Sequence, residues 1–156
     1  MRVLLLKLSL LTMAVTMQLA AADLFLGTWK LDPAKSKYDP GPGPKSSTVV
    51  YSADGDWIAI KIEGVAADGK ATSNSFRYKR DGKDYPWNTA TESGKSTISI
   101  KMMDDHHSVA TVKRDGKAIS TSKNTISKDG KTRTMATTGT NAEGKKYSNV
   151  AVFTRQ

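Results

Sequence analysis

The sequence contains no cysteine, only two histidines and few aromatic residues, which make up 7% of the chain. Without cysteine there can be no disulfide, no thiolate metal site and no cysteine nucleophile, so stability must come from a packed core. No Gly-x-Ser-x-Gly motif is present, and beyond residue 22 no window shows an apolar stripe with a period of 3.6 residues. These absences argue against a helical fold and against the common hydrolases.

The one long apolar run lies at the N-terminus. Arg2 and Lys7 precede an apolar stretch over residues 8–19, and three alanines ending at Ala22 follow it. A basic start, a short apolar centre and small residues at its end are typical of a secretory signal peptide. We predict cleavage after Ala22, a single domain over residues 23–156, and a periplasmic or secreted protein whose mature chain has no membrane span.

The predicted mature chain has few large apolar residues for a core and many hydroxyl side chains. It has 31 large apolar side chains against 29 serines and threonines. Its formal net charge is +7, because two of the nine excess positive charges lie in the leader. The basic residues are spread along the chain, which indicates a solvated surface. We expect no nucleic-acid partner, although an anionic polymer of the cell envelope stays open as a partner.

A repeated turn motif divides the domain. Asp-Gly-Lys occurs four times, at residues 68–70, 81–83, 115–117 and 129–131, and Ser93-Gly94-Lys95 and Glu143-Gly144-Lys145 are variants. Asp-Gly is a strong signal for a two-residue hairpin turn of type I′, which needs positive φ at both central residues. The spacing predicts tight turns joining short strands.

The segments between these turns alternate with a period of two residues. Residues 57–63 read WIAIKIE and residues 96–102 read STISIKM. This pattern is typical of strands with one buried face. We predict an all-β fold, an antiparallel up-and-down β-barrel of about ten strands in which the last strand pairs with the first. An open two-sheet sandwich is the alternative, but it favours longer crossovers.

One connection is long. Residues 32–46 begin with Asp32-Pro33, which predicts a capped helical turn, and continue through Pro40, Pro42 and Pro44. Two hypotheses fit this segment. It is either a lid over a binding cavity or a rigid strap that seals one end of the barrel.

The opening LFLGTWKL (residues 24–31) resembles the first strand of the calycins, the superfamily of lipocalins and fatty-acid-binding proteins. The whole mature chain also resembles a group of small secreted bacterial lipocalin-like proteins, in which GTWKL (residues 27–31), AKSKY (residues 34–38) and Asp-Gly-Lys turns recur. The resemblance implies a barrel with a small-molecule cavity and no cofactor.

The resemblance also implies roles for three residues. In lipocalins the motif tryptophan plugs the closed end of the barrel beneath a basic side chain of the last strand. Gly27, Trp29 and Arg155 are expected to form this structural closure here. Fatty-acid-binding proteins carry an Arg-x-Tyr carboxylate clamp on their last strand, and the matching positions are Ala151 and Phe153. That clamp is therefore missing.

Alternation assigns the side chains expected to point inward and contact a ligand. The candidate ligand-binding residues are Tyr51, Ile58, Ile60, Ile62, Phe76, Tyr78, Trp87, Ile98, Ile100 and Met102. Pro86 cannot donate to a strand ladder, so the segment around it is expected at a bulge or at the barrel rim. The hydroxyls of residues 120–138 fall on both strand faces, which predicts a partly wet cavity.

No set of residues predicts catalysis or a metal site. His106 and His107 follow Asp104 and Asp105, but neighbouring residues of a strand point to opposite faces, so a polar turn is the better interpretation. We therefore predict a protein that is not an enzyme and that binds a small, partly hydrophobic molecule inside its barrel. The alternative hypothesis is a structural or interaction module with a filled interior, whose basic surface binds anionic envelope polymers.

Overall fold

The computed structural model describes residues 23–87 and 95–156, so the predicted signal peptide and the turn at Ser93-Gly94 lie outside the described residues. Eleven strands form one antiparallel sheet. They are β1 (Gly27–Leu31), β2 (Lys37–Asp39), β3 (Ser46–Asp54), β4 (Trp57–Val65), β5 (Ala71–Tyr78), β6 (Tyr85–Pro86), β7 (Ser96–Met102), β8 (His107–Arg114), β9 (Lys117–Ile126), β10 (Thr132–Thr140) and β11 (Lys146–Arg155). The described part of the chain contains no helix that could cross a membrane.

The chain runs back and forth until its last strand meets its first. The strand order is β5-β4-β3-β1-β11-β10-β9-β8-β7-β6, with β2 added beside β11. Trp29 of β1 lies opposite Arg155 of β11, and Leu31 lies opposite Phe153. The predicted pairing of the last strand with the first is therefore confirmed, and the fold is a nearly closed antiparallel barrel with ten strands on its main path.

The barrel is not fully closed by hydrogen bonds. Within the described ranges, β5 and β6 lie at the two ends of the strand order and share no ladder. The reason is local, because β6 has two residues and one of them is Pro86, which has no backbone N–H. β5 and β6 therefore remain the two edges of the sheet, and Pro86 lies in one of them.

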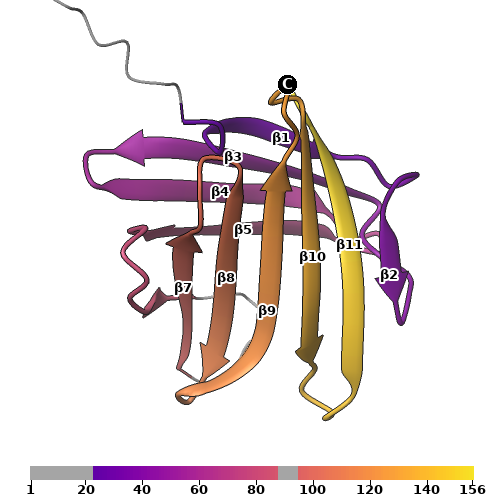
Figure 1. Ribbon diagram of the computed structural model, residues 1–156. Helices are drawn as coiled ribbons and strands as arrows, with labels where there is room; N and C mark the ends of the chain where they lie inside the picture. Colours follow the sequence, from indigo (N-terminus) through magenta and orange to yellow (C-terminus); the bar gives the residue numbers. More distant parts are fainter. Residues whose placement is uncertain (1–22, 88–94) are drawn as a thin grey trace, which may run out of the picture.

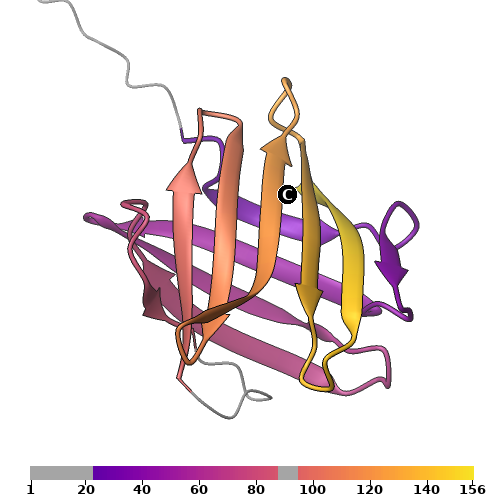
Figure 2. The ribbon, with the colours of Figure 1, turned by 60° about the horizontal axis from the view of Figure 1, so that its bottom comes forward.

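The barrel is flattened into two layers. Figure 1 shows β1, β3, β4 and β5 lying across β7 to β11, and Figure 2 shows the same crossing from another side. The inward faces of both layers form one core, which includes Ile60 and Tyr78 from the first layer and Ile98, Ile126 and Phe153 from the second. The interior of the protein is the space between these layers.

The Asp-Gly-Lys turns differ from the prediction. Among the described copies, only Asp115-Gly116 has two central residues with positive φ, at 48° and 78°. Three others share a different contact, in which the aspartate Oδ1 accepts the backbone N–H of the lysine two residues later, at 3.0 Å in each case (Asp68, Asp81 and Asp129). In these three copies the aspartate therefore closes an Asx turn that contains the glycine.

The long connection contains a strand that the sequence did not predict. Asp32 accepts the N–H of Lys35 at both its backbone and side-chain oxygens, which gives the expected single turn. The Ser36 hydroxyl then accepts the N–H of Val152 at 2.9 Å, and β2 pairs with residues 148–150 of β11. The segment is therefore hydrogen-bonded to the free part of the β11 edge before it reaches Pro40, Pro42 and Pro44.

Candidate functional site

A cavity of about 400 Å³ lies between the two layers of the barrel. Its size falls within the range of about 300–1,000 Å³ that is typical of small-molecule sites. It is lined by inward-facing side chains of every strand on the main path except β6, together with Phe25, Tyr38, Pro44 and Trp87. The interior of the barrel is therefore not completely filled by its own side chains.

The structure brings together most of the predicted ligand-binding residues. Those that line the cavity are Tyr51, Ile60, Ile62, Phe76, Tyr78, Trp87, Ile98 and Ile100. Ile58 and Met102 pack in or against the core without lining the cavity, because each lies near the end of its strand. Alternation therefore gave the correct face, and the role of these residues in binding stays a prediction.

Trp29 packs into the end of the barrel at which β1 pairs with β11, and this end is its floor. This side chain is fully buried, and its Nε1 donates to the carbonyl of Phe25 at 3.1 Å. The Arg155 guanidinium lies over the indole, 4.4 Å from its centroid, as the resemblance implied. Trp29 is not among the residues that line the cavity, so it belongs to the floor.

Gly27 is required by the same closure. Its φ is +110°, and a Cβ built on it would lie 2.8 Å from Arg155 Nη1. That guanidinium also donates from Nε to Gly130 O at 2.8 Å, from Nη1 to Leu26 O at 2.7 Å, and from Nη2 to Leu24 O. The Gly-x-Trp motif therefore leaves room for an arginine that ties three loop carbonyls to the floor.

A second arginine lies inside the cavity, and the sequence analysis missed it. Arg133 of β10 is only 5% exposed, and its Nε and Nη2 both donate to Asn124 Oδ1, at 3.2 and 2.7 Å. Its guanidinium lies 4.7 Å from the Tyr51 ring centroid and 5.9 Å from that of Phe153. Within residues 23–87 and 95–156, no carboxylate forms an ion pair with it.

Arg133 stands beside the position of the missing clamp. Ala151 and Phe153 do line the cavity, and Arg133 lies directly opposite Phe153 in the ladder between β10 and β11. A basic group therefore enters this region from the neighbouring strand. The available signal was period-two alternation from Phe153 across the hairpin, which places Arg133, Met135 and Thr137 on the inward face.

The phenol of Tyr78 is held neutral by its surroundings. Burial, followed by the neighbouring phenol of Tyr51, raises the pKa of Tyr78 to about 12. Tyr78 is 3% exposed and contributes an uncharged hydroxyl to the cavity wall. Arg133 is therefore the charged side chain among the residues that line the cavity.

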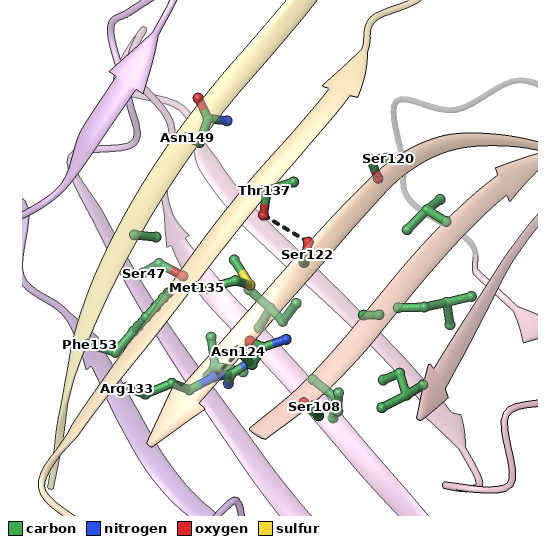
Figure 3. A pocket seen from close by; sticks show the side chains of 18 of the residues that line it. Ser47, Ser108, Ser120, Ser122, Asn124, Arg133, Met135, Thr137, Asn149 and Phe153 are labelled. Atoms are coloured by element: carbon green, nitrogen blue, oxygen red, sulfur yellow. Dashed lines mark hydrogen bonds between the residues drawn. The ribbon is translucent and has the colours of Figure 1, made fainter. Parts of the chain in front are cut away.

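Polar side chains gather on the wall formed by β8, β9 and β10. Ser122 and Thr137 lie opposite each other, and their hydroxyl oxygens are 2.8 Å apart (Figure 3). Ser120 and Asn124 lie on either side of Ser122 along β9, and Ser108 faces Asn124 from β8. The predicted hydroxyl-bearing interior is therefore present on one wall of the cavity.

The segment of residues 40–44, here called the proline segment, lies at the end of the cavity that is distant from Trp29. A second hollow is formed by this segment and the end of the β10–β11 hairpin, with Asn141 from the turn, and it shares Tyr38, Pro44, Tyr147 and Asn149 with the main cavity. Tyr38 supports the segment, because a Cβ on Gly43 would lie 2.1 Å from its ring. The segment therefore borders the mouth of the cavity.

Tyr85 and Trp87, on either side of Pro86, make different contacts. Trp87 lines the cavity and contacts Phe76 with ring centroids 4.4 Å apart. Tyr85 instead contacts Trp57, at 5.2 Å, and donates its hydroxyl to Asp81. Trp87 therefore belongs to the cavity wall, whereas Tyr85 does not.

The histidines do not converge. His106 Nδ1 lies 3.0 Å from the carbonyl of Ile126, while His107 Nδ1 lies 2.8 Å from the Asp104 carboxylate. The backbone N–H of His106 and the His107 ring together lower the pKa of Asp104. Among the described side chains, no three His, Asp or Glu residues form a group that could hold a metal ion.

Several solved structures share this arrangement. A fatty-acid-binding protein of Schistosoma mansoni, in complex with arachidonic acid, aligns with a TM-score of 0.58 at 16% identity, over 88% of this chain and 99% of that one. The zebrafish ileal bile-acid-binding protein, in complex with cholic acid, aligns with a TM-score of 0.52 at 13% identity, over 85% and 99%. As-p18, an extracellular fatty-acid-binding protein, aligns with a TM-score of 0.51 at 15% identity, over 86% and 97%.

No protein-family model and no curated protein sequence matches the chain. The alignments cover nearly the whole length of each of these neighbouring chains, so the likeness extends to the complete barrel. The antiparallel path, the pairing of first and last strands and the central cavity are all present. This chain therefore has the same barrel fold as these neighbours, as the resemblance of its opening motif implied.

Proposed function

We propose that the protein binds a small amphipathic acid in its barrel cavity without transforming it chemically. The observation that carries this proposal is Arg133, a buried guanidinium whose hydrogen-bond acceptor, Asn124, is neutral. A buried charge is costly unless it is paired, and a ligand carboxylate would supply the missing counter-charge. The apolar side chains around it would hold the rest of the ligand.

The fold neighbours support this proposal. Two of them are named as fatty-acid-binding proteins and one as a bile-acid-binding protein, and the ligands in two of those structures are carboxylic acids. The cavity of this chain offers an apolar space with a buried cation, a combination that suits a carboxylic acid. We extend the proposal to location, with residues 1–22 directing export to the periplasm or the exterior and Asp23 beginning the mature chain.

The test compares an acid with its uncharged ester. Arachidonate and methyl arachidonate are titrated by calorimetry into the protein and into the variant Arg133→Met, which keeps length and apolar contact but removes the charge. One charge-assisted hydrogen bond contributes about 1.5–3 kcal/mol, so the variant should bind the acid about 10- to 100-fold more weakly. Its affinity for the ester should stay within about twofold of the original.

The variant Arg77→Met is the matched control. Arg77 lies on the outer face of β5, where its guanidinium is 4.8 Å from the Trp57 ring centroid, so its loss should leave acid binding unchanged. Equal binding of acid and ester by the unmodified protein would contradict the proposal. The proposal would also be contradicted if neither arachidonate nor methyl arachidonate bound to the protein.

A further inference from the structure

The cavity has two unlike walls. The first layer contributes mainly apolar and aromatic side chains, such as Val49, Ile60, Ile62 and Phe76. The opposite layer contributes Ser120, Ser122, Asn124 and Thr137 from its central strands β9 and β10, as Figure 3 shows for the polar side. A ligand between the layers therefore meets mainly hydrocarbon on the first layer, and on the opposite layer a polar band of β9 and β10 beside apolar residues such as Ile98 and Phe153.

The polar groups form a row rather than a single point. Ser120, Ser122 and Asn124 alternate along β9, and inward-facing residues of a strand repeat about every 6.5–7 Å, so the row extends for roughly 13 Å. Arg133 and Thr137 are separated by the same number of residues on the neighbouring strand. A molecule with its acid at Arg133 that extended along these strands would lie against the whole row.

A plain hydrocarbon chain is a poor match to this row. Ser122 and Thr137 share one hydrogen bond, which uses one of their two protons and leaves the other proton and several lone pairs unused. Apolar contact would leave these groups without partners, whereas a ligand hydroxyl would satisfy them. Water could also do so, provided that the ligand leaves space for it.

We infer that the ligand is an elongated acid with hydroxyl groups along one side and an apolar opposite side. Its carboxylate pairs with Arg133, its hydroxylated side lies on β9 and β10, and its apolar side lies on β3, β4 and β5. This inference rests on the proposed function and adds the arrangement of polar groups along the ligand. The Ser122–Thr137 pair is the specificity-determining element.

The test uses three acids that differ in the groups they carry. Cholate has three hydroxyls on one face of a rigid skeleton, lithocholate has one hydroxyl on the same skeleton, and palmitate has none. Each is titrated calorimetrically, below its aggregation limit, into the protein and into the double variant Ser122→Ala/Thr137→Val. The ratio of cholate affinity to lithocholate affinity should fall by about tenfold in the variant, whereas palmitate affinity should hold or rise.

The control Thr138→Val removes an exposed hydroxyl of β10 that does not line the cavity, next to Thr137, and should leave the ratio unchanged. If the double variant does not fold by circular dichroism, Ser120→Ala tests the same row with a smaller expected fall of about threefold. A ratio that stays within twofold of the original would overturn the inference and indicate that water solvates this wall.

The same titrations separate the inference from the proposed function. If palmitate binds in an Arg133-dependent manner while cholate does not bind, the inference fails and the proposed function stands. If none of the three acids binds, both fail.

Discussion

Replacing Arg155 with lysine should destabilise the protein without impairing its cavity. The Arg155 guanidinium donates to the carbonyls of Gly130, Leu26 and Leu24 while it covers the Trp29 ring. A lysine ammonium in the same place keeps the positive charge and the contact with the indole, but it can reach only one of these carbonyls. Two hydrogen bonds are therefore lost, and two partly buried acceptors are left without their donors.

The size of the effect follows from those two bonds. Each unsatisfied acceptor costs about 1–3 kcal/mol, so the free energy of unfolding should fall by about 3 kcal/mol. For a domain of this size, that corresponds to a drop of roughly 10 °C in Tm. Urea denaturation followed by far-ultraviolet circular dichroism measures the loss directly.

Arg77→Lys is a control with the same chemical change. Arg77 also lies over an indole, 4.8 Å from the Trp57 centroid, but within the described residues it forms no hydrogen bond to a carbonyl. Its replacement should cost less than about 1 kcal/mol. If Arg155→Lys proved as mild as this control, the stability of the floor would come from the stacked charge alone, and the reasoning from the carbonyls would be refuted.

Two further predictions concern Gly27 and Tyr78. Gly27→Ala should lower the free energy of unfolding by about 2–4 kcal/mol, because alanine is strained at a φ of +110° and its Cβ meets Arg155. Gly55→Ala, at a φ of +58° with open space around the Cβ, should cost only about 1 kcal/mol in the same urea assay, and equal losses would count against the contact with Arg155. Tyr78 ionises at a pKa of about 12 in the folded protein against 10.0 unfolded, so its contribution to stability is complete below pH 10 and is lost as the pH rises toward 12. The loss is on the order of 2–3 kcal/mol, and Tyr78→Phe should make the urea midpoint less dependent on pH between 9.5 and about 11.5; an unchanged slope would contradict the assignment.

Period-two alternation made most of the fold predictable. The strand around Ile60 and Ile62 has a clear apolar face, and a shift by one residue would have turned that face to solvent, so the register had one sensible solution. The alternation shows which face of the strand a residue occupies, but it does not show how far along the barrel axis that residue lies. Ile58, near the beginning of β4, therefore looked equivalent to its neighbours although it lies beside the cavity rather than on it.

The part of the site that carries charge was not predictable by the same argument. Around Arg133 both strand faces bear small polar side chains, with Thr132 and Thr134 on one face and Thr137 on the other. Such a strand has no hydrophobic side to fix its orientation, and an arginine within it looks like a solvated surface residue. Its inward direction depends on the register against Phe153, which only the folded barrel supplies.

The pairing of β1 with β11 joins residues from the two extremes of the domain. Until β11 reaches β1, Trp29 has a neighbouring strand only on its β3 side and lacks the cover of Arg155, so the interior stays open to solvent. Closure of the barrel therefore waits for β11 and is slow, as is usual when segments far apart in the sequence must pair.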